Sequence, residues 1–388
     1  MKRRQLGAVA ALLLVGVAGC GEDPPPSAGS VKVGLLVSLS GIYQSVGTDM
    51  RDGFLLYLAT HGEKLGGRAV DLVVADEGDG APTAVPAATK LVESDGVVAV
   101  VGVVGGGSVA GIAPMLAEHE IPLIGSNARP DLPDHEWLWT TSFLSDEPGQ
   151  AIAAYVKEHT DGPVFAIGPD YQGGHDELRG FTDEFARIDG ELANPGGTTL
   201  FTPFPATTNF LPYFAQIRAS GAKAVYAFYA GKAAIDFVTQ YRQSDIADIP
   251  LYGAFLTEGS VLQAEGEAAV GVQNVLNYSP DLDHAENRSF VAEWTQRYPG
   301  RAPTTFAMAT FDAAAVLDIA IGSIEGEVTS RALNDAIPRV GELYSPRGPW
   351  QFNLETHAPV QRWYLREVRY DGTVLANTVV EELATLGN

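Results

Sequence analysis

Apolar runs typical of buried strands alternate with amphipathic stretches of helical spacing from Val31 onward. Apolar strand patterns fall at 31–41, 70–79, 97–108 and 121–127, and helical patterns at 49–60, 83–94 and 109–118. Continuous apolar strands separated by helices indicate a parallel sheet covered on both faces. The first third of the chain therefore predicts one α/β unit.

The same alternation of apolar strand patterns and helical patterns begins again after Pro148. Helical patterns fall at 150–160, 176–188 and 233–244, and strand-and-loop patterns at 163–174, 222–231 and 249–259. Because the pattern occurs twice, we predict two doubly wound α/β lobes.

The last third breaks this order. Two helical stretches, at 286–300 and 304–324, have no strands of their own and must return to an existing lobe, and the segment 350–374 is rich in β pattern. A chain that crosses between the lobes several times predicts a hinge made of two or three strands.

The N-terminus has the three parts of a secretory signal peptide, namely a basic start, the apolar run Leu6–Ala18 and small residues before Cys20. The run is too short to span a bilayer, although a buried first helix is an alternative. The ending Val-Ala-Gly-Cys resembles the bacterial lipobox. This resemblance implies a mature chain that starts at Cys20, tethered by lipid to a membrane outside the cytoplasm, in the periplasm or on the outer face of the cytoplasmic membrane. Residues 21–30 are rich in Pro, Gly and Ser, a composition that predicts an extended spacer.

Charge and cysteine content exclude several function classes. A formal net charge of −23 makes the chain a poor partner for nucleic acid or anionic lipid headgroups. Cys20 is the only cysteine, so the chain can form no internal disulfide and no thiolate metal site. The scattered histidines show no metal-ligand spacing, and no Gly-x-Ser-x-Gly elbow is present. We therefore predict no metal, no cofactor and no enzymatic activity, although an extracellular enzyme remains the least favoured alternative.

The loops after the strands carry the candidate ligand residues, because ligands of open α/β sheets bind beyond the carboxyl ends of the strands. The glycines 105–107 and Ser108 stand directly before a helix. Such a loop brings backbone N–H groups close to a ligand, and the helix N-terminus favours an anion. A tight turn without a ligand is the alternative. A nucleotide site is not indicated, since neither a P-loop lysine nor Gly-x-Gly-x-x-Gly spacing is present.

Three long stretches, at 31–58, 87–125 and 344–372, resemble the branched-chain amino-acid binding proteins of ABC transporters, which have the type I periplasmic binding fold. The resemblance implies a signal peptide at 1–19, a tether at 20–30, an N-terminal lobe of 31–147 and 275–342, and a C-terminal lobe of 148–274 and 343–388. It also implies a monomer that captures a small molecule between its lobes, closes about the hinge and delivers the ligand to an ABC permease. A ligand-sensing receptor component of the same fold is the alternative.

Carried over residue by residue, the resemblance gives the expected ligand-binding set. The loops expected to hold the ligand carboxylate contain Gly106, Gly107 and Ser108, followed by Asn127 and Ala128. Aromatic contacts are expected from Tyr171 and Tyr229. Tyr43 is expected to line the cleft because it lies in the loop after the first strand, and this expectation does not come from the resemblance. The acidic residue that pairs with a ligand ammonium falls near Phe255, which is apolar, and Glu258 is its candidate replacement, as is Asp170. The ligand is therefore an amino acid if Glu258 or Asp170 supplies the missing charge, and otherwise a related carboxylate with an apolar or aromatic body. Amides and other polar small molecules stay open.

Overall fold

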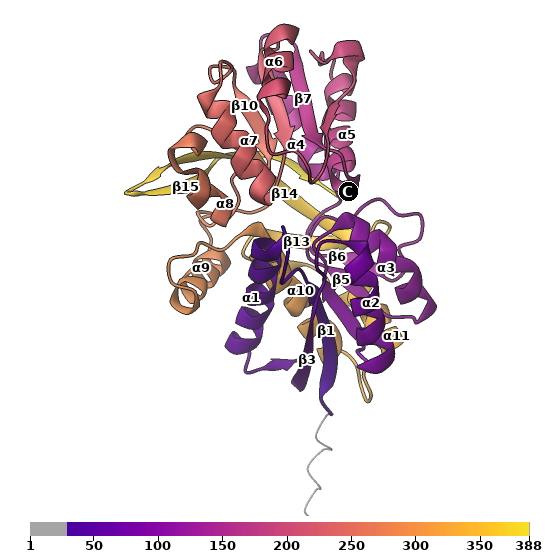
Figure 1. Ribbon diagram of the computed structural model, residues 1–388. Helices are drawn as coiled ribbons and strands as arrows, with labels where there is room; N and C mark the ends of the chain where they lie inside the picture. The colour runs from indigo at the N-terminus through magenta and orange to yellow at the C-terminus, as the bar shows by residue number, and fades with distance from the viewer. Residues whose placement is uncertain (1–28, 388) are drawn as a thin grey trace, which may run out of the picture.

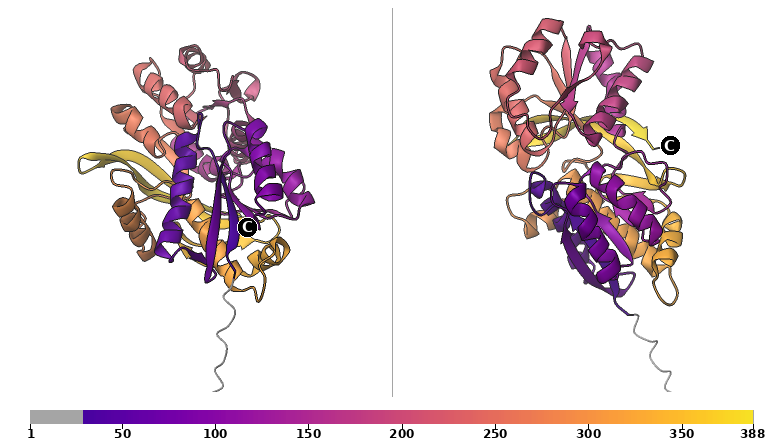
Figure 2. Two further views of the ribbon diagram at one scale, coloured as in Figure 1. Left: turned by 60° about the horizontal axis from the view of Figure 1, so that its bottom comes forward. Right: turned by 45° about the vertical axis from the view of Figure 1, so that its right-hand side comes forward.

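The computed structural model describes residues 29–387 and contains two α/β lobes, one above the other (Figure 1). The predicted signal peptide, Cys20 and most of the tether lie outside the described residues. Two views from other directions show the last strands passing between the lobes (Figure 2). The prediction of two doubly wound lobes joined by a multi-strand hinge is confirmed.

The N-terminal lobe is built on a six-stranded sheet with alternate side chains on opposite faces. On β1 (Val31–Val37), Leu36 faces α2 (Ala81–Thr89) and α3 (Gly106–Glu118), whereas Leu35 faces α1 (Gln44–Thr60) and α10 (Thr305–Gly322). The strands in order are β2 (Lys64–Leu65), β3 (Arg68–Asp76), β1 (Val31–Val37), β4 (Ala99–Gly102), β5 (Leu123–Gly125) and β6 (Leu138–Thr140). The helices of this lobe are α1 (Gln44–Thr60), α2 (Ala81–Thr89), α3 (Gly106–Glu118), α9 (Ala285–Arg297), α10 (Thr305–Gly322) and α11 (Ser330–Ala336).

The C-terminal lobe repeats the plan around a nine-stranded sheet. Its path runs β12 (Leu343–Ser345), β13 (Gly348–Asn353), β14 (Ala358–Asp371), β11 (Gln273–Leu276), β10 (Leu251–Ala254), β9 (Ala224–Phe228), β7 (Val164–Pro169) and β8 (Leu200–Thr202), and β15 (Val374–Leu386) pairs with β14. Its helices are α4 (Glu147–His159), α5 (Gln172–Arg187), α6 (Leu211–Ser220), α7 (Gly231–Gln243) and α8 (Ser260–Glu265). Because β11 pairs inside this sheet, the chain leaves the C-terminal lobe after Leu276.

Among residues 29–387, α10 is the one helix long and apolar enough to cross a bilayer. It packs along α1, and 72% of its apolar window is buried. Its side chains also contact the sheet, as Ala313 and Leu317 join the same core as Val33 and Leu35. We therefore assign α10 to the core of the N-terminal lobe, as the sequence predicted for helices without strands of their own.

A buried polar network ties together the three segments that cross between the lobes. The first crossing is 141–146 after β6, the second is 277–284 after β11, and the third is 340–347 before β13. Arg347, on the third crossing, pairs with Asp312 of α10 at 2.6 Å and donates to the backbone carbonyl oxygens of the first crossing. Gln361 of β14 accepts from Arg347 at 2.5 Å and from Asn277, on the second crossing, at 2.9 Å. The Arg347 guanidinium therefore contacts the first crossing directly and is linked to the second crossing through Gln361.

A different buried acid, Glu265 at the end of α8, has no partner for either carboxylate oxygen. Burial raises its pKa to about 9, so the group is neutral in the folded protein near pH 7. The unfolded chain ionises this group near its ordinary pKa, so stability is lost as pH rises between the two values, from about 5 to about 9. We expect the unfolding free energy of E265Q, relative to the wild type, to be about 4 kcal/mol higher at pH 8 than at pH 5, because the wild type loses about 1.4 kcal/mol per pH unit in this window. Denaturant unfolding at both pH values checks this, and equal differences at pH 5 and pH 8 would contradict it.

Candidate ligand-binding cleft

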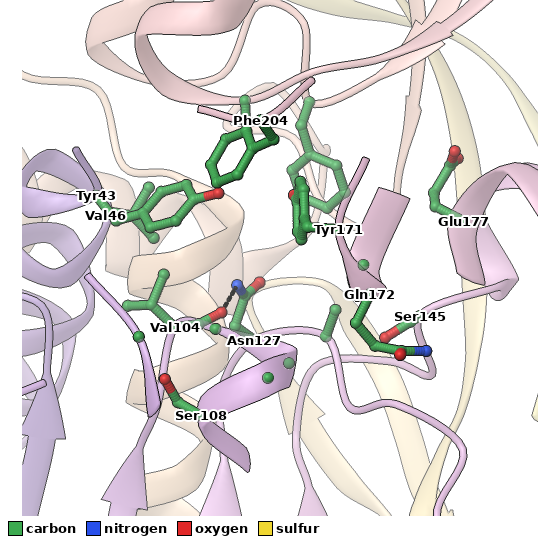
Figure 3. Close-up of a pocket in the computed structure, with 18 of the residues that line it drawn as sticks. Tyr43, Val46, Val104, Ser108, Asn127, Ser145, Tyr171, Gln172, Glu177 and Phe204 are labelled. Atoms are coloured by element: carbon green, nitrogen blue, oxygen red, sulfur yellow. Dashed lines mark hydrogen bonds between the residues drawn. The ribbon is translucent and has the colours of Figure 1, made fainter. Parts of the chain in front are cut away.

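A cavity of about 240 Å³ lies between the lobes, where the loops after the strands of both sheets meet (Figure 3). The N-terminal lobe contributes the loops after β1, β3, β4, β5 and β6 and the start of α10. The C-terminal lobe contributes the loops after β7, β8, β9 and β10. The sequence-predicted residues that line it are Tyr43, Gly106, Gly107, Ser108, Asn127, Ala128, Tyr171 and Phe255.

One wall of the cavity is the N-terminus of α3. This helix starts at Gly106 and has no side-chain cap, so its first backbone N–H groups have no partner within the helix. Ser108 Oγ is buried with no hydrogen-bond partner, and so is Ser126 Oγ. A Cβ added at Gly107 would meet nothing within 4 Å, so this position faces open space. The wall offers donors and a partial positive charge to an anion.

The loop before α3 is held in place by Glu77, at the end of the strand β3. Its carboxylate accepts from the backbone N–H groups of Val104 at 2.6 Å and Gly105 at 2.9 Å. Asn127 braces the same loop by donating to the Val104 carbonyl at 2.7 Å, while its own Oδ1 is buried without a partner. The loop is therefore rigid, with several polar atoms left for a ligand.

The floor of the cavity is aromatic. Phe255 lies with its ring centroid 5.8 Å from those of Phe228 and Phe306 and 5.6 Å from that of Phe143. Phe255 also has a φ of 62°, a left-handed backbone conformation that is unusual for a bulky residue and is found at functional sites. This floor suits a flat apolar body.

The two lobes touch across the mouth of the cavity. The Tyr43 ring of the N-terminal lobe lies 6.4 Å from Phe204 of the C-terminal lobe, and Phe204 lies 4.7 Å from Tyr171. Burial raises the pKa of Tyr43 to about 12, so its hydroxyl stays protonated. Sequence reasoning missed Phe204, which lies in the irregular loop after β8.

Two predicted ligand residues do not line the main cavity. Tyr229 is 1% exposed and packs between Phe210 and Phe237, with its hydroxyl 3.1 Å from Thr202 Oγ1. Successive residues leave a strand on opposite sides, so its neighbour Phe228 reaches the cavity instead.

Glu258 is engaged elsewhere. Its buried carboxylate pairs with Arg366 at 2.9 Å and accepts from the Thr305 backbone N–H at 2.9 Å, which joins the C-terminal lobe to the start of α10. Asp170, the other candidate partner for an ammonium, is exposed and lies 2.8 Å from His175. Neither carboxylate faces the main cavity.

Two carboxylates that the sequence reasoning did not select line the cavity. Asp79 is exposed at the rim and accepts from the Ile42 backbone N–H at 2.9 Å. Glu177 lies on α5 and is fully buried. No group of three or more His, Cys, Asp or Glu side chains suited to a metal ion is found among residues 29–387.

The two lobes, the hinge and the enclosed cleft define a protein that binds a small molecule between its domains. Residues 30–373 match the family model described as periplasmic binding protein, so the chain belongs to this family. The chain is 29% identical over 357 residues to "Leu/Ile/Val-binding protein homolog 6" of Brucella melitensis, covering 88% of this chain and 89% of the relative.

Solved structures agree with this assignment. The chain is similar to a solute-binding protein of an R. palustris ABC transporter, crystallised in complex with benzoate, with 30% identity, a TM-score of 0.82, and coverage of 92% of this chain and 97% of that one. It is also similar to an ABC transporter substrate-binding protein of Sphaerobacter thermophilus, with 28% identity, a TM-score of 0.83 and coverage of 92% and 98%. The chain is thus an extracytoplasmic substrate-binding protein of an ABC transporter and not an enzyme.

Proposed function

We propose that this protein captures a small aromatic carboxylate between its lobes and delivers it to an ABC importer. The observation that carries the proposal is the pairing of an anion-binding wall at Gly106–Ser108 with an aromatic floor around Phe255. The carboxylate binds the free N–H groups and Ser108, and the ring lies on the phenylalanines. The R. palustris relative in complex with benzoate supports this ligand class.

An amino acid fits the cavity less well. A buried ammonium without a carboxylate partner costs several kcal/mol. Phe255 is apolar where the resemblance places that partner, and Glu258 is already paired with Arg366. Of the two carboxylates that line the cavity, Asp79 lies exposed at the rim, and burial raises the pKa of Glu177 to about 8, so that it is mostly neutral at pH 7. A ligand without an ammonium therefore suits the described residues better than leucine or isoleucine.

Isothermal titration of the purified protein with benzoate, benzamide and leucine tests the proposal. We expect benzoate to bind about 100-fold more tightly than benzamide, because benzamide has the same shape but no charge for the α3 N-terminus. We expect leucine to bind more weakly than benzoate. Leucine binding at least as tight as benzoate binding would overturn the aromatic assignment.

We also propose that Cys20 carries a lipid that anchors the protein beside its permease. C20S is expected to move the protein from the membrane fraction to the soluble fraction, because acyl chains contribute about 0.8 kcal/mol per buried methylene. Ligand affinity should not change, since residues 29–387 by themselves form both lobes and line the cavity. Fractionation and titration check the two halves of this prediction, and a membrane-bound C20S protein would contradict the anchor.

A further inference from the structure

Glu177 is a buried acid on the wall of the ligand cavity. It lies on α5 and is only 1% exposed. Figure 3 shows Glu177 and Ser108 on opposite sides of the cavity, with Tyr171 and Asn127 between them. Its Oε1 accepts from the hydroxyl of Tyr226 on β9, and its Oε2 has no hydrogen-bond partner. A charge on Glu177 would therefore act on the same cavity as the anion-binding wall at α3.

The charged groups packed around Glu177 do not neutralise it. Asp146, which precedes α4, presents a like charge. Arg179, on α5 itself, lies 3.6 Å from the carboxylate of Asp146 and 3.5 Å from that of Asp176. The strand β7 has no titratable residue, and the titratable residue of α3 is Glu118, at the end away from the cavity. Among residues 29–387, no basic side chain lowers the pKa of Glu177.

Glu147, at the start of α4, is a second buried acid near Glu177, and burial raises its pKa to about 8. It differs from Glu177 in two respects. The guanidinium groups of Arg129 and Arg347 offset its charge, and it does not line the cavity. Burial also holds the pKa of the Tyr171 hydroxyl well above its ordinary value, so this group stays protonated. Glu177 is therefore the acid expected to put a new charge on the cavity in mildly alkaline solution.

Ionisation of Glu177 opposes the binding of an anion. Burial raises its pKa to about 8, so the group is mostly neutral at pH 7 and becomes charged as pH rises through about 8. An ionised Glu177 and a carboxylate at the α3 wall are like charges in one partly buried cavity. At a separation of about 10 Å, such a pair weakens binding on the order of tenfold. By linkage, a bound anion favours the neutral form of Glu177 by the same factor.

We propose that this protein binds its anionic ligand together with a proton, which Glu177 holds. Ligand affinity is greatest where Glu177 is neutral and falls as this acid ionises. In mildly alkaline solution, binding takes up a proton from the solvent. This inference rests on the proposed function, because it requires a negatively charged ligand.

The test is a titration of the purified protein with benzoate, which is ionised throughout, at pH 6.5 and pH 9. We expect the wild-type affinity to fall about fivefold between these values, as a tenfold coupling to a group of pKa about 8 gives. At pH 8, binding should take up about 0.4 proton per ligand, measured from binding heats in buffers of different ionisation enthalpy. E177Q cannot ionise and should lower the affinity ratio below about 1.5 and abolish the proton uptake. Benzamide, which is uncharged, should bind the wild type equally at both pH values.

E265Q and E147Q are the matched controls. Glu265 is a buried acid with a raised pKa that does not line the cavity, so E265Q should keep the wild-type ratio. E147Q removes the neighbouring acid and should keep a ratio above about 3. Should E177Q fail to fold, Y226F takes its place. The bond from Tyr226 stabilises the ionised carboxylate, so its loss raises the pKa of Glu177 and should lower the ratio below about 3.

Three results would overturn the inference while benzoate binding keeps the proposed function. They are a wild-type ratio below about 2, a ratio unchanged by the variant of Glu177 or Tyr226, and a ratio lost in E147Q. Leucine binding at least as tight as benzoate binding at pH 6.5 would overturn the proposed function and this inference with it.

Discussion

Gly107→Asp is expected to abolish measurable benzoate binding while the protein stays folded. Gly107 is the second residue of α3 and faces open space in the cavity. An aspartate carboxylate there would occupy the same N–H groups as the ligand carboxylate. Two like charges about 4 Å apart repel by about 4 kcal/mol in a partly buried site, which corresponds to a loss on the order of 1000-fold in affinity. An acid in the first turn of a helix is itself favourable, so the melting temperature should hold or rise.

Gly107→Asn is the matched control for this variant. Asparagine has nearly the same size and also suits a helix start, but it brings no charge. We expect it to lose less than tenfold in benzoate affinity. If Gly107→Asp bound benzoate within tenfold of the wild type, the ligand carboxylate would have to lie elsewhere in the cavity.

Replacing Arg347 by methionine is expected to lower the free energy of unfolding by about 3–5 kcal/mol. Arg347 is 2% exposed, and it holds Asp312, Gln361 and the backbone of the first crossing. Its removal leaves the Asp312 carboxylate buried without a counter-charge, which is the costly way to break a buried ion pair. Denaturant unfolding followed by two spectroscopic probes measures the change and shows whether the lobes still unfold together.

The exposed pair of Arg331 with Glu120 gives the comparison. Both side chains are about half exposed, so R331M should cost less than about 1 kcal/mol. The double variant R347M/D312L should recover part of the loss, since it removes both charges together. A loss below 1 kcal/mol in R347M would show that the network does not stabilise the hinge.

The sequence was sufficient to predict the two lobes and eight of the residues that line the cavity. Strand-end loops are found from apolar runs alone, and this rule selected Tyr43, Gly107, Asn127 and Tyr171, all of which line the cavity. The same rule misplaced Tyr229 by one position, because a shift of one residue along a strand reverses the side to which a side chain points.

Contacts between distant segments could not be predicted from the sequence. Glu258 looks like a free acid until Arg366, on β14, is brought beside it. Phe204 stands in a loop without periodicity, and Glu177 has the spacing of an ordinary surface residue on α5 until Tyr226 and the cavity are in view. Pairings of this kind depend on the closed fold and leave no local pattern.

The packing of α10 along α1 has a consequence for biosynthesis. More than 240 residues separate Thr60 from Thr305, yet the two helices share one core of the N-terminal lobe. A chain emerging from the ribosome therefore lacks an essential part of its first domain until its last third has been made. Domains closed by such distant segments fold slowly. We expect the nascent chain to remain loosely folded for most of its synthesis. This delay leaves time for the chain to pass through a narrow translocation pore before the N-terminal lobe is complete.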